Sequence, residues 1–540
     1  MALTVTLLLA IATALWLALR AAERWLTDVY CAVGDIQHFQ DTVKHKRQGR
    51  AVIVGASISG ILTGEFPGAP ELHAGQRRAN SHHLQPESAP NTLTPCCCSM
   101  QKSARQTRQS GATASSNITN FTVFFLGLMY PALKAMFSNF EPALYEAGGK
   151  IVPPHSVSYK GSGGGFQQLP DAQKTGWPVR QLYISREALE ALLRRLLLSS
   201  CKNVDSRVGT AKGIVISQDH KRVGSVMVRS SDGQMENVEC ELIVDASGTT
   251  NGSIGWLKNA GFKTPEKVTY DPAIVYTCFT FHTTPATRAK YDAIKGAPRT
   301  WQQSGHIGAC AAPQHYSAFL QMEDGKVRTM FQTFTGQDTD PKSVQDVETE
   351  YAVGPYEPWQ QEAIKLLCRA EDDGADPAIR SKVAIGLCYR VTFDAKQMPV
   401  NLIPLGDTIL RVNPIFGQGC AKSVVDALTL DRVLRQQDGR TLTQSWVNKF
   451  LDLHAKRLDP LWETTRVHDY AHPETTPCAG ETREWGARRR RLLAWTASAG
   501  CKSATIGGQL CEIAAQLRPN WRIYDPRFLF QCALVHLTWR

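Results

Sequence analysis

The clearest feature of the hydrophobic pattern is a short apolar run followed by glycines and serines near the start of the chain. The run Ala51-Val52-Ile53-Val54 leads into a Gly-rich stretch that ends at Gly60, and apolar residues resume at Ile61. Four consecutive apolar residues predict a strand buried on both faces, as in a parallel sheet. The glycine-rich stretch predicts a tight turn and the first turn of a helix.

The same pattern predicts further elements along the chain. Leucines recur at helical spacing over 186–198 behind Ser185, which predicts a helix with a serine cap. Residues 207–246 alternate as short strands that end in the apolar run Leu242-Ile243-Val244. The β-rich runs at 274–277 and 328–331 predict a sheet over a substrate pocket.

Regular patterning disappears between residues 65 and 120. Pro, Gly, Ser, His and Arg dominate this stretch, and Cys96, Cys97 and Cys98 stand together within it. A structureless segment of more than fifty residues does not suit the interior of a compact domain. The sequence therefore predicts a disordered or aberrant segment, either a retained intron or gene-model error or a genuine insertion.

The N-terminus carries an apolar run from Leu3 to Leu19 with no charged residue inside it. Its length is close to the roughly 17 residues that a helix needs to cross the hydrocarbon core. Basic residues from Arg20 to Arg50 follow the run, which favours a signal anchor with the body of the protein in the cytosol. The sequence predicts a single-pass anchor over 1–25, a membrane partner and a location at the endoplasmic reticulum.

Composition narrows the class of protein. The chain has 540 residues, 43% of them apolar and 20% charged, which suits a folded protein large enough to bury a cofactor. The net charge of +11 is scattered, without the aromatic interleaving or motif of a nucleic-acid-binding protein, so no nucleic-acid partner is predicted. The 15 cysteines form no paired CxxC motifs, so neither a disulfide framework nor a metal site is predicted.

The turn after the first apolar run reads Gly55-x-Ser57-x-x-Gly60, close to the three-glycine dinucleotide fingerprint. Gly55 permits a tight turn, and the helix start behind it presents N–H groups to a pyrophosphate. Gly60 lets the helix lie close to the strand, and the small Ser57 replaces the second glycine of the fingerprint. A strand-turn-helix unit without a ligand is the alternative.

Two later patterns suit the same kind of ligand. The strand 242–244 runs into Asp245-Ala246-Ser247-Gly248, which places a carboxylate and an open turn at a strand end, although a plain turn would look similar. The pair Gly406-Asp407 is followed by Asn413-Pro414-x-x-Gly417-Gln418-Gly419. Its carboxylate suits a ribityl or ribose hydroxyl, and its glycines open a helix start toward an anion or a flavin ring.

These three patterns, in this order, resemble the FAD-dependent monooxygenase superfamily of aromatic hydroxylases, epoxidases and geranylgeranyl reductase-like flavoproteins. The resemblance covers 50–64 and 125–435. It implies an α/β fold: an FAD-binding Rossmann-like (GR2-type) domain with an inserted β-sheet substrate domain and a C-terminal helical tail. The corresponding ranges are 50–260 with 385–435 for the FAD-binding domain, 265–385 for the substrate domain and 436–540 for the C-terminal helical region.

The resemblance also implies roles for particular residues. The carboxylate of Asp407 would bind the ribitol, Pro414, Gly417 and Gly419 would lie beside the isoalloxazine, and Arg186, with Arg180 as second choice, would contact an FAD phosphate or ribose. The predicted cofactor-binding residues are Gly55, Ser57, Gly60, Arg186, Asp245, Gly406, Asp407, Pro414, Gly417 and Gly419.

The implied function is that of an NAD(P)H-dependent monooxygenase that acts on a hydrophobic small molecule through a flavin C4a-hydroperoxide. FAD would carry the chemistry, so no catalytic acid or base is assigned. One departure stands out: the family has a second strand that ends in a ribose-binding Asp or Glu about 20 residues past the glycines, where this chain enters the irregular stretch. The alternatives are a flavin-dependent prenyl-chain reductase and a degenerate, non-catalytic flavoprotein-like binding protein.

Overall fold

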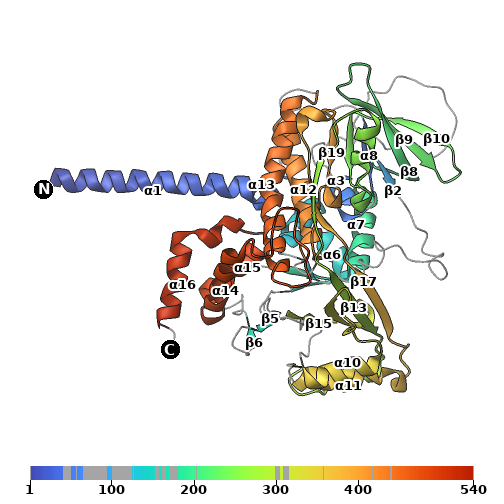
Figure 1. Cartoon of the computed structure of the whole chain (residues 1–540), viewed down its shortest axis with the longest axis vertical. Coiled ribbons are helices and arrows are strands. Elements are labelled where there is room, and N and C mark those ends of the chain that lie inside the picture. Colours follow the sequence, from blue (N-terminus) through green and yellow to red (C-terminus); the bar gives the residue numbers. More distant parts are fainter. Residues whose placement is uncertain are drawn as a thin grey trace.

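The largest sheet of the protein has seven strands in the order β10-β9-β8-β2-β1-β11-β19. The strands from β8 to β19 run parallel, while β9 and β10 are added as antiparallel neighbours (Figure 1). The bounds are Met235–Glu239 for β10, Val223–Ser230 for β9, Asp205–Ile216 for β8, Thr94–Ser99 for β2, Arg50–Val54 for β1, Leu242–Asp245 for β11 and Leu402–Pro404 for β19. A mixed α/β fold with a parallel sheet is confirmed.

This architecture comes from a computed structural model of the chain. It describes residues 2–39, 50–55, 57–64, 94–99, 124–125, 127–152, 157–160, 166–168, 180–201, 203–297, 305–307, 316–354, 356, 358–414, 417–437 and 441–538.

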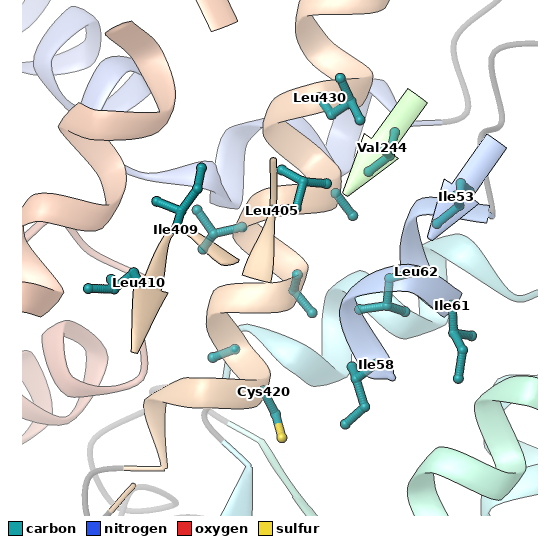
Figure 2. Close-up of a cluster of buried hydrophobic side chains, with 14 of the residues drawn as sticks. Ile53, Ile58, Ile61, Leu62, Val244, Leu405, Ile409, Leu410, Cys420 and Leu430 are labelled. Atoms are coloured by element: carbon teal, nitrogen blue, oxygen red, sulfur yellow. The ribbon is translucent and has the colours of Figure 1, made fainter. Parts of the chain in front are cut away.

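The apolar runs found in the sequence form the core of this sheet. Ile53 of β1 and Val244 of β11 are fully buried. Figure 2 shows them in one cluster with side chains from α3 (Ile58–Gly64) and α12 (Gln418–Arg435), among them Leu62 and Leu430. Each such side chain contributes about 1.5–3 kcal/mol when it is buried. The cluster therefore holds α3 and α12 in fixed positions relative to the strands.

One strand forms inside the segment that was expected to lack structure. Residues Thr94–Ser99 form β2, which pairs in parallel with β1 on one side and with β8 on the other. These six residues depart from the predicted disorder, because the backbone N–H and C=O groups of the strand pair with β1 on one side and with β8 on the other. The rest of 65–120 lies outside the described residues.

A second, antiparallel sheet has the order β15-β16-β13-β17. Its bounds are Tyr316–Gln321 for β15, Val327–Phe334 for β16, Ile274–Phe281 for β13 and Ile379–Ala384 for β17. Phe279 and Phe281 of β13 pack against Tyr291, Tyr351 and Ile364 of three neighbouring helices, whereas Tyr276 faces the main core. Those helices are α9 (Pro285–Asp292), α10 (Val344–Val353) and α11 (Pro358–Cys368). The sheet lies in the predicted substrate region, but its assignment as a domain stays a prediction.

Two smaller features complete the parts that matter for the site. A three-stranded sheet joins β12 (Glu266–Tyr270), β18 (Cys388–Thr392) and β20 (Leu410–Arg411). Helices dominate the C-terminal region, as Figure 1 shows. They are α13 (Gln444–Asp469), α14 (Ala487–Lys502), α15 (Ala504–Ala514) and α16 (Pro526–Thr538).

The N-terminal apolar run is part of a longer helix, α1 (Ala2–Tyr30), which projects from the body in Figure 1. No helix in the described part of the chain is long and apolar enough to cross a bilayer. The predicted anchor, membrane partner and endoplasmic-reticulum location are therefore wrong. The helix continues past the apolar run into charged residues that dock on the body, where Glu23 pairs with Arg522 and Asp28 with Arg432.

Buried ion pairs fasten this N-terminal segment to the core. Asp35, the first residue of α2 (Asp35–His38), is 4% exposed and lies 2.9 Å from Arg432 of α12 and 2.7 Å from Arg457 of α13. Arg457 is also 4% exposed. Removing one partner of such a pair leaves a buried charge uncompensated.

We therefore expect Asp35→Ala to lower the free energy of unfolding by about 3 kcal/mol. As a control, Glu146→Ala breaks an exposed pair with Arg195 and should cost less than about 0.5 kcal/mol. Urea unfolding followed by tryptophan fluorescence measures both. Equal effects of the two substitutions would contradict the role given to Asp35.

Candidate functional site

The three sequence patterns lie at one edge of the parallel sheet. In the register of the strands Val54 pairs with Asp245, and Asp245 pairs with Pro404. Since β1, β11 and β19 are parallel neighbours, the turns that follow them emerge side by side at their carboxyl ends. This edge is where open α/β sheets bind their ligands.

The turn from β1 into α3 depends on its glycines. Gly55 has φ of +117°, and a Cβ there would lie 2.2 Å from the carbonyl oxygen of Ala246. A Cβ on Gly60 would lie 1.9 Å from the carbonyl oxygen of Gly55. The exposed Ser57 precedes α3, and its carbonyl accepts from the N–H of Ile61 at 3.0 Å. The helix start thus lies tight against the strand end, as the fingerprint requires.

The turn at Gly406 packs directly on this helix. Gly406 has φ of +65°, and a Cβ there would lie 2.6 Å from Oγ of Ser59 in α3. Ser59 Oγ also lies 2.7 Å from Oγ of Ser423 in α12. The N–H of Gly406 donates to Oδ2 of Asp426 at 2.9 Å, and Oδ1 of Asp426 lies 2.7 Å from Nε2 of His454. The two loops, far apart in the sequence, therefore meet.

The carboxylate of Asp407 is half exposed at this meeting point. Its Oδ1 accepts from Nζ of Lys422 at 2.6 Å, and the Lys422 side chain is only 1% exposed. Within the described part of the chain, Oδ2 forms no hydrogen bond, so it is available to accept from a ligand hydroxyl. Burial would raise the pKa of Asp407, but Lys422, Arg186 and Arg411 hold it below its usual value. The group therefore stays an ionised acceptor at neutral pH.

Helix α12 begins at the same place. Gly417 has φ of +65° before the first turn of the helix, and its N–H donates to the carbonyl of Pro414 at 2.9 Å. A Cβ on Gly419 would have no heavy atom within 4 Å. In the described part of the chain, a side chain at Gly419 would therefore enter unoccupied space at the start of α12.

Arg186 begins α7 (Arg186–Ser200), whose serine cap is confirmed: Ser185 Oγ accepts from the N–H of Ala188 at 3.1 Å. The guanidinium lies close enough to lower the pKa of Asp407, and its buried Nε has no hydrogen-bond partner among the described residues. It is thus a cation available to an anionic ligand. Arg180 is exposed, and the structure gives it no link to these turns.

The carboxylate of Asp245 shapes the turn that follows β11. It is fully buried, its Oδ1 accepts from the N–H of Ser247 at 2.9 Å and its Oδ2 accepts from the N–H of Ser253 at 2.6 Å. Ser253 lies in the first turn of α8 (Gly252–Asn259). Both carboxylate oxygens therefore help to shape the turn, and the contact of Asp245 with a cofactor stays a prediction.

No family model matches the chain. A curated relative, Protein Rv3254 of Mycobacterium tuberculosis (strain ATCC 25618 / H37Rv), is 25% identical over 431 residues, which covers 79% of this chain and 81% of the relative. The solved structure of p-nitrophenol 4-monooxygenase PnpA from Pseudomonas putida DLL-E4 is 14% identical and covers 88% of this chain and 99% of its own, with a TM-score of 0.52.

A second solved structure, PqsL of Pseudomonas aeruginosa in complex with 2-aminobenzoylacetate, is 14% identical and covers 78% of this chain and 94% of its own, with a TM-score of 0.50. The chain has the fold of the FAD-dependent monooxygenases. The fold therefore confirms the resemblance that the three sequence patterns indicated.

Several residues of the site were not predicted from the sequence. Lys422, Asp426 and His454 support the Gly406-Asp407 turn, yet each lies inside a helical pattern where a polar residue attracts no notice. A usable signal was present in α12, because Lys422 and Asp426 interrupt an otherwise small and apolar stretch four residues apart. In the described residues, no cluster of His, Cys, Asp and Glu could hold a metal ion.

The contact between Gly60 and Gly55 gives a direct test of the site's geometry. We expect Gly60→Ala to lower the free energy of unfolding by about 3 kcal/mol, since the added methyl group overlaps backbone that cannot move away. The matched helix substitution Gly255→Ala in α8 meets no atom within 4 Å and should be neutral or stabilising. Thermal unfolding compares the two, and equal stability would contradict the close approach of helix and strand.

Proposed function

We propose that this protein is an FAD-dependent oxidoreductase, and specifically an NAD(P)H-dependent monooxygenase of a hydrophobic small molecule. The observation that carries the proposal is the packing of the Gly406-Asp407 turn on the Gly-rich helix start, beside the open first turn of α12. A single elongated dinucleotide bound along this edge of the sheet would contact these three segments one after another. The fold shared with p-nitrophenol 4-monooxygenase supports it.

The residues present fit FAD. The backbone N–H groups of Ser57 and of the first turn of α3 would face the pyrophosphate. Arg186 would add a positive charge. Oδ2 of Asp407 would accept from a ribityl hydroxyl while Lys422 holds its other oxygen. The open space at Gly419 would admit the edge of the isoalloxazine. The bound flavin would supply the redox chemistry, with NAD(P)H as reductant and oxygen as co-substrate.

The place of the substrate follows from the second sheet. Tyr276 of β13 donates from its hydroxyl to Oδ1 of Asn413 at 2.8 Å, which joins this sheet to the loop before α12. A substrate next to this sheet and that loop would lie against the flavin ring. Tyr276 and Cys278 of β13 are buried in the main apolar core, and this apolar setting supports the preference for a hydrophobic molecule.

One observation favours the non-catalytic alternative. Strand β2 ends at Ser99, where the family has a carboxylate for the adenosine ribose, and serine cannot replace its two acceptor oxygens. Loss of that contact would weaken FAD binding. Whether the remaining contacts hold FAD is therefore the decisive question.

A titration with FAD answers it. The wild-type chain should bind FAD, and Gly419→Leu should weaken binding at least about tenfold because its side chain fills the space at the ring edge. Gly255→Leu is the matched control, since it also replaces an open helix glycine and lies outside the site. Both variants should keep wild-type stability or exceed it. Equal affinity of the two variants, or no binding by the wild type, would overturn the proposal.

The type of reaction is tested with the FAD-loaded protein. A monooxygenase should consume oxygen and NAD(P)H together, and a hydrophobic phenol or terpenoid should accelerate both. A prenyl-chain reductase would oxidise NAD(P)H without a matching uptake of oxygen. A protein that binds FAD but oxidises no NAD(P)H with any such compound would be a binding protein.

A further inference from the structure

A buried carboxyl group sits directly behind the loop that leads into α12. Asp469, the last residue of α13, is 2% exposed, and Asn413, which precedes Pro414 in this loop, is 1% exposed. Nδ2 of Asn413 donates to Oδ1 of Asp469 at 2.9 Å. The hydroxyl of Tyr270 in β12 donates to Oδ2 of Asp469 at 2.7 Å. Both carboxylate oxygens are therefore bonded, and one of them holds the loop.

Asn413 passes this contact on to the second sheet. Its Oδ1 accepts from the hydroxyl of Tyr276 in β13 at 2.8 Å. The amide is thus fixed in one orientation, with its N–H group toward Asp469 and its oxygen toward Tyr276. Pro414 follows it directly, so a shift of the Asn413 side chain moves the backbone that enters the first turn of α12.

The surroundings of Asp469 contain no compensating charge among the described residues. The carboxyl forms no ion pair there, and burial raises its pKa to about 7, although the hydrogen bonds from Asn413 and Tyr270 act in the opposite direction. The titratable groups around it are Tyr270, Cys388 of β18 behind Tyr270, and the neighbours His468 and Tyr470 on its own segment. Burial lowers the pKa of His468 to about 4, and burial raises the pKa of the two tyrosines and of Cys388. Among these neighbouring groups, Asp469 is therefore the one that changes its charge near neutral pH.

We propose that Asp469 is a positioning residue for the loop that enters α12 through Asn413, and that its ionisation, transmitted through Asn413, tightens this loop at the flavin site. An ionised carboxylate accepts from Asn413 in a charge-assisted hydrogen bond, which is stronger than a neutral one. A protonated carboxyl can still accept from Asn413 but turns its own proton toward Tyr270, so its hold on the loop is weaker. The effect on the flavin rests on the proposed function, while the effect on the loop does not.

The loop itself gives a readout that does not need FAD. In the wild-type chain, amide hydrogen exchange over 410–424, divided by the intrinsic rate at each pH, should slow about fivefold between pH 6 and pH 8. Asp469→Asn should show no such step, because the amide cannot ionise. The control Asp431→Asn removes another buried carboxyl with a raised pKa, about 6, at the far end of α12, and should keep the wild-type step.

A second variant tests the proposal even if the Asp469→Asn protein does not fold. Tyr270→Phe removes one of the two hydrogen bonds that stabilise the ionised form, so the midpoint of the step should move to higher pH. If Asp469→Asn or Tyr270→Phe leaves the step and its midpoint at the wild-type position, or the wild type shows no step, the proposal is overturned.

FAD titration connects the loop to the cofactor. The affinity of the wild type should rise about fivefold from pH 6 to pH 8, and that of Asp469→Asn should stay constant. A wild type that binds FAD equally at both values would overturn the link between Asp469 and the flavin. A wild type that binds no FAD at either pH would refute the proposed function, and the exchange measurement would still decide the role of Asp469.

Discussion

The contact between the Gly406 turn and Ser59 of α3 is the constraint on which the site depends. No side chain can stand at Gly406, because its Cβ would lie 2.6 Å from Ser59 Oγ, and the positive φ there excludes most residues independently. The carboxylate of Asp426 fixes the same turn by accepting a hydrogen bond from the N–H group of Gly406. Two segments more than 300 residues apart in the sequence are thereby joined at the edge of one sheet.

Charge follows from this geometry. The turn places Asp407 against the buried Lys422 and near Arg186, and these cations keep the carboxylate ionised although burial opposes it. Replacing Asp407 would leave Lys422 as a buried, uncompensated cation, so loss of binding and loss of folding could not be separated there. A side chain added at Gly419 would meet no neighbouring atom, so this position separates the two effects and makes a sharper probe of the flavin site.

The sequence predicted what local patterns control and missed what distant partners control. The turns after β1 and β19 were readable because glycines, an aspartate and an apolar run stand at fixed spacing. The role of Asp245 depends on the N–H of Ser253 in α8, and β2 exists because β1 and β8 offer it two edges, so neither could be read locally. The N-terminal run looked like an anchor because it is apolar, whereas the ion pairs that Glu23 and Asp28 form later in the same helix depend on Arg522 and Arg432, about 400 or more residues away.

The structure of the chain with FAD bound tests the central claim most directly. The account predicts one FAD molecule with its pyrophosphate at the start of α3, a ribityl hydroxyl on Oδ2 of Asp407 and its ring edge within van der Waals distance of Gly419. FAD bound at any other surface, or touching only one of these segments, would contradict it.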